Sequence, residues 1–176
     1  MRSVTIFAVI FAVFNSVVLL MSPAAQADTN LTVEVEIPRL SVAEYHRPYI
    51  AIWVSDPHQQ RVSDIEVWYD TAMANQEGHK WLPDLRQWWR RSGRQLDLPV
   101  DGVSGATRAP GNHSISVRES ALQALERGDY ILHIEAAREV GGREHLRLPF
   151  SWPANAGLLQ EQQGEHELGR VRLHAH

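Results

Sequence analysis

Residues Tyr130 to Phe150 carry the clearest indication of the fold and read Tyr-Ile-Leu-His-Ile-Glu-Ala-Ala-Arg-Glu-Val-Gly-Gly-Arg-Glu-His-Leu-Arg-Leu-Pro-Phe. In its first third, successive residues fall into two sets that would point to opposite faces, with apolar side chains at every second position. This period of two is the pattern of a β-strand. The pair Gly141-Gly142 can supply the positive φ values that a tight turn needs. The segment 144–150 then returns as a second strand. We therefore predict an antiparallel hairpin at the centre of a β-rich fold.

Other strands are predicted on both sides of this hairpin. Residues 31–37 alternate strictly between apolar and polar side chains, and residues 49–54 are apolar on both faces, as in a central strand. Shorter runs of the same kind cover 65–69, 115–117 and 167–173. Seven short strands separated by turn signals predict a mainly β fold, an antiparallel β-sandwich of the immunoglobulin or transthyretin type.

Two segments interrupt the strand pattern. Four apolar residues fall at helical spacing: Trp81, Leu85, Trp88 and Trp89. Pro83 lies in the first turn and Gly93 lies beyond the end, so we predict one inserted amphipathic helix. Because Trp88 and Trp89 are adjacent on that helix, one of them is expected to be partly exposed and available to a flat ligand. We also predict a helical turn at 119–127 and a surface connection at 154–164.

The N-terminal segment has the features of a secretory signal. Arg2 precedes an apolar run over residues 4–21, Pro23 breaks the run, and Ala25-Gln26-Ala27 matches the small-x-small cleavage pattern. We predict cleavage after Ala27, which makes residues 1–27 a signal peptide and residues 28–176 a single β-sandwich domain in the periplasm. The alternative is a membrane anchor, since the apolar run is just long enough to span a bilayer.

Composition excludes several classes of protein. The 176 residues carry a formal net charge of −4, so binding to nucleic acid through phosphate neutralisation is not expected. The chain has no cysteine, which excludes disulfides, zinc–thiolate sites and a cysteine nucleophile. Apolar residues make up 44% of the chain and charged residues 22%, as in ordinary globular domains.

One loop carries the candidate chemistry. It reads Asp101-Gly-Val-Ser-Gly-Ala-Thr-Arg-Ala-Pro-Gly111. A purely structural interpretation is a long turn, in which glycines supply positive φ values and the hydroxyls of Ser104 and Thr107 bind nearby backbone groups.

The same loop resembles the target motif of bacterial flavin transferases, in which an Asp is followed by Ser/Gly-Gly-Ala-Thr. The matching positions are Asp101, Ser104, Gly105, Ala106 and Thr107. The resemblance implies that the Thr107 hydroxyl is joined to the phosphate of flavin mononucleotide (FMN), with Arg108 available to pair that phosphate. Such acceptors usually continue with another pair of hydroxyl residues, whereas this chain continues with Arg-Ala-Pro-Gly.

A wider resemblance covers nearly all of the predicted mature chain. The segments 47–56, 80–91, 100–111 and 128–144 together resemble a predicted periplasmic family, domain of unknown function 2271. The family's members resemble partners of flavin transferases and of membrane redox proteins of the PepSY type. The resemblance implies an exported flavin-carrying electron-transfer component rather than an enzyme with a substrate pocket.

Other interpretations remain open. A flavin-free binding or scaffold module would use the sheet edge or the Trp-rich helix to bind a partner. His133 and His145 lie on the paired strands of the hairpin and could face each other, but no third ligand has a suitable spacing, so no metal site is predicted. Ser104, His113 and Asp101 share one loop, yet nothing around them resembles the elbow of a hydrolase nucleophile.

Overall fold

The computed structural model describes residues 30–176, so the predicted signal segment and its cleavage site lie outside the described residues. The described chain forms nine strands: β1 (Leu31–Ile37), β2 (Tyr49–Ser55), β3 (Arg61–Tyr69), β4 (Ser104–Ala106), β5 (Gly111–Ser116), β6 (Gly128–Ala137), β7 (Arg143–Trp152), β8 (Leu159–Gln163) and β9 (Arg170–Ala175). Its helical segments are η1 (Ala74–Asp84), α1 (Arg86–Arg91), η2 (Gly93–Gln95) and α2 (Glu119–Gln123).

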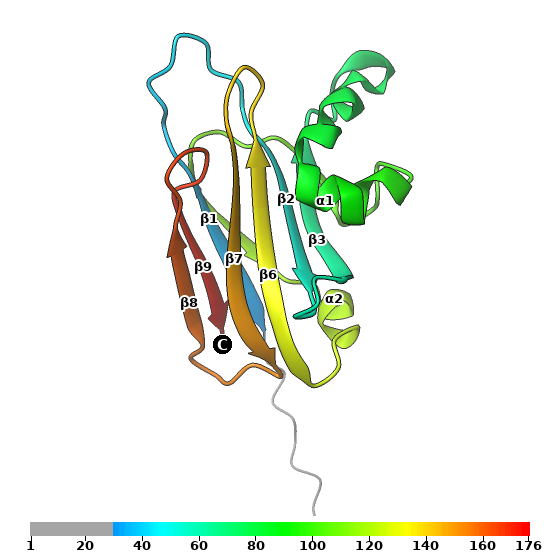
Figure 1. Ribbon diagram of the computed structural model, residues 1–176, viewed down its shortest axis with the longest axis vertical. Helices are drawn as coiled ribbons and strands as arrows, with labels where there is room; N and C mark the ends of the chain where they lie inside the picture. Colours follow the sequence, from blue (N-terminus) through cyan, green and yellow to red (C-terminus); the bar gives the residue numbers. More distant parts are fainter. Residues whose placement is uncertain (1–29) are drawn as a thin grey trace, which may run out of the picture.

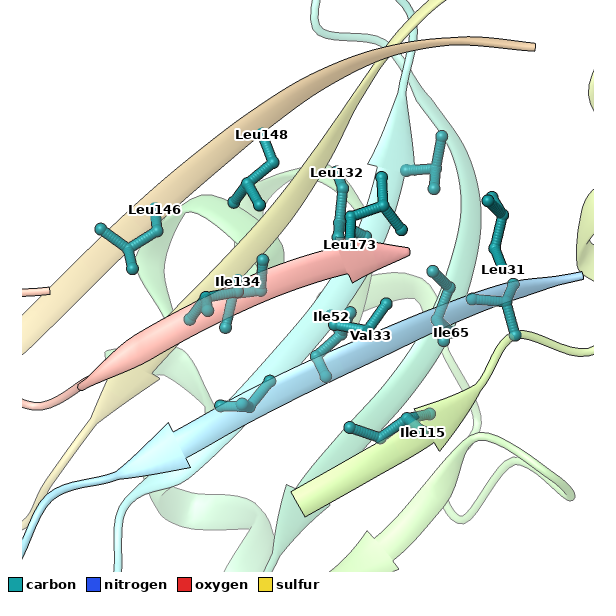
Figure 2. Close-up of a cluster of buried hydrophobic side chains, with 14 of the residues drawn as sticks. Leu31, Val33, Ile52, Ile65, Ile115, Leu132, Ile134, Leu146, Leu148 and Leu173 are labelled. Carbon is teal, nitrogen blue, oxygen red and sulfur yellow. The ribbon is translucent and has the colours of Figure 1, made fainter. Parts of the chain in front are cut away.

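The strands form two sheets that pack against each other, which confirms the predicted mainly β fold. One sheet has the order β5-β1-β9-β8 and the other the order β4-β3-β2-β6-β7. Figure 1 shows the two layers side by side, with η1 and α1 on the outer side of the five-stranded sheet and α2 apart from them near the other end of the sandwich. Figure 2 shows how Leu31, Val33 and Leu173 of one sheet meet Ile52, Leu132 and Leu148 of the other.

The central hairpin is present as predicted. Strands β6 and β7 pair antiparallel from Gly128 opposite Trp152 to Ala137 opposite Arg143. Its turn differs from the expectation, because the positive φ value falls on Val140 and not on Gly141 or Gly142. At the two glycines a side chain would instead crowd the Arg138–Glu167 ion pair. A Cβ at Gly141 would lie 2.4 Å from Cζ of Arg138, and one at Gly142 would lie 2.9 Å from Oε1 of Glu167.

Two strands were not predicted from the sequence. Strand β4 lies inside the loop 101–111 and pairs in parallel with β3, whereas all other neighbouring strands of the described residues are antiparallel. Strand β8 lies inside 154–164, which we expected to be a surface connection. Both strands are at sheet edges and are short, so neither carries an alternation long enough to detect.

The predicted amphipathic helix is divided into two pieces. Residues 74–84 form η1, Leu85 leaves the helical region with φ −74° and ψ 69°, and only Arg86–Arg91 is α-helical. Pro83 lacks the N–H that a continuous helix would use. The predicted inner face is nevertheless correct at Leu85 and Trp88, both fully buried. The second helical turn is present as α2, with Leu122 buried against the core.

Two buried carboxylates hold the helical layer on the sheet. Glu135 of β6 accepts hydrogen bonds from the backbone N–H groups of Gln87 (2.9 Å) and Trp88 (2.9 Å) at the start of α1. Asp64 of β3 accepts hydrogen bonds from Nε1 of Trp88 (3.1 Å) and from the hydroxyl of Ser92 (2.7 Å). A second apolar cluster therefore forms on the outer face of the five-stranded sheet, beneath these helical segments.

Candidate functional site

The loop 101–111 lies along the outer edge of the five-stranded sheet. Gly102 has a φ of +66°, as predicted for a turn glycine, and β4 then runs parallel to β3 with Gly105 opposite Trp68. Gly105 is needed for a different reason from the predicted one. Its φ is not positive, but a Cβ there would come within 3.3 Å of the Trp68 ring. The small side chains of the motif thus let the loop lie close against β3.

Thr107 follows β4 directly and borders a cleft. Its backbone N–H donates to the carbonyl of Tyr69 at 3.1 Å, which fixes the residue beside the end of β3. The cleft has a volume of about 320 Å³, within the usual range for small-molecule sites. Its walls come from the segment before β2, the end of β3, η1, and the turn between β6 and β7.

Aromatic side chains line much of this cleft. Tyr45 and Tyr49 contribute from the N-terminal side of β2, and Trp81 contributes from η1. Trp81 is 40% exposed, whereas Trp88 is fully buried and Trp89 is half-buried. The aromatic surface beside Thr107 is therefore provided by Trp81, and not by the Trp88 and Trp89 pair that the helical pattern indicated.

Charged groups of both signs also line the cleft. The positively charged or titratable ones are Arg47, Arg138 and His46, and the acids are Asp70, Asp84 and Glu139. His46 lies between two carboxylates, 2.8 Å from Glu44 and 3.5 Å from Glu139. Arg138 is held by Glu167 through Nε (2.8 Å) and Nη2 (3.1 Å), and its side chain is only 6% exposed.

The remaining motif residues do not gather around Thr107. Asp101 is exposed in the turn before β4 and does not border the cleft. The Ser104 hydroxyl accepts a hydrogen bond from the Val100 N–H at 3.0 Å, which agrees with the structural interpretation of that hydroxyl. Ala106 is exposed at the end of β4. The guanidinium of Arg108 lies 4.0 Å from the ring centroid of Trp68, so it stacks on a side chain outside the cleft.

The Ser-His-Asp combination of this loop does not form a catalytic triad. The Ser104 hydroxyl is engaged by Val100, and the His113 ring nitrogen Nε2 lies 2.8 Å from the Ala109 carbonyl. Across residues 30–176, no three His, Asp or Glu side chains come close enough together to hold a metal ion.

The two hairpin histidines do face each other, as the sequence suggested. They belong to a chain of hydrogen bonds that also includes Ser55, which the sequence did not indicate. Nδ1 of His133 lies 3.0 Å from Nε2 of His145, and Nε2 of His133 lies 2.7 Å from the hydroxyl of Ser55. Trp53 stacks on both imidazoles, with ring centroids 4.7 and 5.4 Å away. Ser55 is fully buried, so this hydroxyl is closed to a substrate.

Burial keeps both of these imidazoles neutral. It lowers the pKa of His133 to about 3, with His145, Arg91 and Arg147 adding to the effect. Burial also lowers the pKa of His145 to about 4, assisted by Arg147, Arg91 and Arg143. The signal that could have found Ser55 is its place at the end of β2, on the same outer face of the sheet as Trp53.

The described structure therefore belongs to the class of two-sheet β proteins with one helical layer and an aromatic cleft at one end. Within residues 30–176, no helix combines the length and the hydrophobicity that a membrane crossing requires. A family model described as "Predicted periplasmic protein (DUF2271)" matches residues 30–170, and the chain belongs to that family. No curated protein and no solved structure matches the chain.

Proposed function

We propose that this protein is a periplasmic carrier of covalently bound FMN, attached through the Thr107 hydroxyl, that transfers electrons between redox partners. The observation that carries the proposal is the position of Thr107. The one threonine that fits the acceptor motif borders a cleft lined by Tyr45, Tyr49 and Trp81. A phosphoester at that residue would tether the ring system beside aromatic side chains on which a flat ring can stack.

The surroundings of Thr107 suit an acceptor that another enzyme must reach. Strand β4 is an edge strand of three residues, and the two residues before Thr107, Gly105 and the exposed Ala106, have small side chains. Phosphoryl transfer requires positioning and charge neutralisation, which the transferase can supply, so a passive acceptor is sufficient.

The attachment step is a displacement at phosphorus. The Thr107 hydroxyl attacks the FMN phosphorus of flavin adenine dinucleotide and forms a new Oγ–P bond. The pyrophosphate bond breaks, adenosine monophosphate leaves with the bond electrons, and the hydroxyl proton passes to a base of the flavin transferase. Arg108 stacks on Trp68, and the arginines that line the cleft are Arg47 and Arg138.

The partners of this role are a flavin transferase and a membrane redox protein of the PepSY type. A bound flavin supplies the electron chemistry, since it accepts and releases one or two electrons. The protein supplies a tether, a stacking surface and an electrostatic environment. Export by cleavage after Ala27 belongs to the same proposal, because the role is periplasmic.

Co-expression with a flavin transferase tests the attachment. The wild-type protein should be yellow, and intact mass spectrometry should detect the added FMN. Thr107→Ala should be unlabelled with an unchanged circular dichroism spectrum, because a phosphoester cannot form on a methyl group. Thr107→Ser should retain part of the label, since the nucleophile remains.

Ser104 provides the matched control in the same loop. Ser104→Ala should stay labelled, because its hydroxyl only accepts the Val100 N–H. Arg108→Ala should also stay labelled, and Asp101→Ala should reduce labelling if that carboxylate helps to present the loop. An unlabelled wild-type protein, beside a transferase that modifies a known acceptor in the same cell, would refute the attachment. The cleft would then belong to a flavin-free binding module.

A further inference from the structure

Arginines of β7 lie on the outer face of the five-stranded sheet, beside α1. Alternate side chains of a strand share one face, so Arg143, His145 and Arg147 point to the same side of the sheet. His145 lies opposite Glu135 of β6, whose carboxylate holds the start of α1 on this outer face. Arg86, the first residue of α1, lines the same hollow as Arg143. The exposed arginines of β7 and those of α1 are therefore neighbours in the folded protein.

The last turn of α1 adds two more guanidinium groups. Arg90 is exposed, and Arg91 is held in place because its Nη2 donates to Oε1 of Gln59 at 2.8 Å. Burial lowers the pKa of His145, and the positive charges of Arg147 and Arg91 add to this effect, so both guanidinium groups lie near that ring. We name the whole set the arginine surface, and its members are Arg86, Arg90 and Arg91 of α1 with Arg143 and Arg147 of β7.

Acids of the same chain do not neutralise the arginine surface. Among the described residues, Arg143 is its only member in an ion pair, with Nε 3.9 Å from Oε1 of Glu135. That carboxylate is fully buried and already accepts the N–H groups at the start of α1. Asp84 and Glu139 line the hollow beside Arg143 but form no ion pair with it. Because the whole chain has a formal net charge of −4, this surface is a local excess of positive charge that an acidic partner would complement.

The residue types on this surface favour protein carboxylates over lipid headgroups. A guanidinium is a planar fork that can bind both oxygens of a carboxylate at once. Trp89, half-buried next to Arg90 on α1, adds a second residue type that is enriched where proteins bind one another. A surface that inserts into a membrane exposes large apolar side chains. In the described structure, α1 and β7 expose no such side chain.

We infer that the arginine surface is a docking site for an acidic protein, whose carboxylates pair with the guanidinium groups of α1 and β7. Complementary charge of this kind speeds the encounter of two proteins and fixes their relative orientation. The hydrogen bonds of Arg91 to Gln59 and Gln87 hold its guanidinium in place before a partner arrives. The inference goes beyond the proposed function, and it holds whether or not Thr107 carries a flavin.

Fluorescently labelled poly-L-glutamate is a suitable probe, because it presents carboxylates on a polypeptide. Fluorescence anisotropy at low ionic strength should show saturable binding to the wild type, and the binding should weaken as salt is added. The double variant Arg90→Gln with Arg147→Gln removes one charge from each element and should weaken the binding at least about tenfold. Both side chains are exposed, so the circular dichroism spectrum should equal that of the wild type.

The matched control is Arg39→Gln with Arg127→Gln, which removes the same charge from exposed positions after β1 and before β6. This control should bind poly-L-glutamate as tightly as the wild type. Equal weakening in the two double variants would mean that binding follows net charge alone, and it would overturn the docking site, as would no binding by the wild type. Vesicles of phosphatidylglycerol distinguish a lipid from a protein. Tighter binding to these vesicles than to poly-L-glutamate would overturn the acidic protein as the partner.

Discussion

At the scale of single residues, Glu135 connects the sheet to the helical layer. Its carboxylate is fully buried and accepts the N–H groups of Gln87 and Trp88. Burial raises the pKa of Glu135, while these two backbone donors and the nearby Arg143 and Arg90 oppose the increase. A carboxylate in such a place is costly to bury and is tolerated because donors from another element surround it.

Replacing Glu135 by Ala should destabilise the protein by about 2–4 kcal/mol, because two buried N–H groups lose their acceptor. The matched control is Glu161→Ala, which removes an exposed partner of Arg172 and should change the stability much less. Urea unfolding followed by tryptophan fluorescence measures both values. Equal losses in the two variants would mean that Glu135 does not hold the helical layer.

The candidate site was predictable from the sequence only where it is contiguous. Thr107 follows from the motif of one loop. Tyr45, Trp81 and Arg138 lie in three separate segments, and only the sheet order brings them to the same end of the sandwich. Arg108 shows that closeness in sequence can also mislead. Its neighbour Thr107 borders the cleft, whereas Arg108 itself stacks on Trp68.

At the scale of elements, long periodic strands were predicted well and short edges were not. In β1 the period-two pattern is long enough to identify the buried face, and β6 is long and mostly buried on both faces. Strand β8, which reads Leu-Gln-Glu-Gln-Gln, presents mostly exposed side chains and has no such face. The segment 74–91 shows that spacing identifies which residues are inward even where Pro83 prevents one continuous helix.

Leu85→Asp tests whether this helical layer is part of the core. Leu85 is fully buried in the outer apolar cluster, so an unpaired carboxylate there should destabilise the protein by several kcal/mol, about 3–5. Leu159→Asp is the control, because Leu159 is 56% exposed on β8 and the change should be close to neutral. Differential scanning calorimetry gives both shifts. A small loss at Leu85 would mean that the layer unfolds independently of the sandwich.

At the scale of the whole molecule, the neutral histidine pair makes stability depend on pH. The pKa values of His133 and His145 lie at about 3 and about 4 in the folded protein, below the ordinary value of 6.5. Between pH 6.5 and the lower pKa values of the folded protein, the unfolded chain binds protons that the folded chain does not. Unfolding is therefore favoured as the pH falls through this range. This contribution to stability is complete above about pH 6.5 and is lost progressively below it.

Urea unfolding between pH 7 and pH 4 measures this dependence. Each histidine that stays neutral should contribute a slope of up to about 1.4 kcal/mol per pH unit. His145→Gln removes one titrating group of the pair and should make the slope shallower, whereas His58→Gln, at an exposed position, should leave it unchanged. Identical slopes in all three proteins would contradict the assignment.

The three-residue parallel strand β4 has a consequence for the order of events in the periplasm. Because it sits at a free margin of the sheet, with only β3 beside it, its pairing can open locally without disturbing the interior. Under the proposed attachment, Thr107 would leave the cleft to meet the transferase after the domain has folded and would return afterwards. Folding and the proposed flavin loading would then be separable steps, because the edge strand opens without unfolding the sandwich.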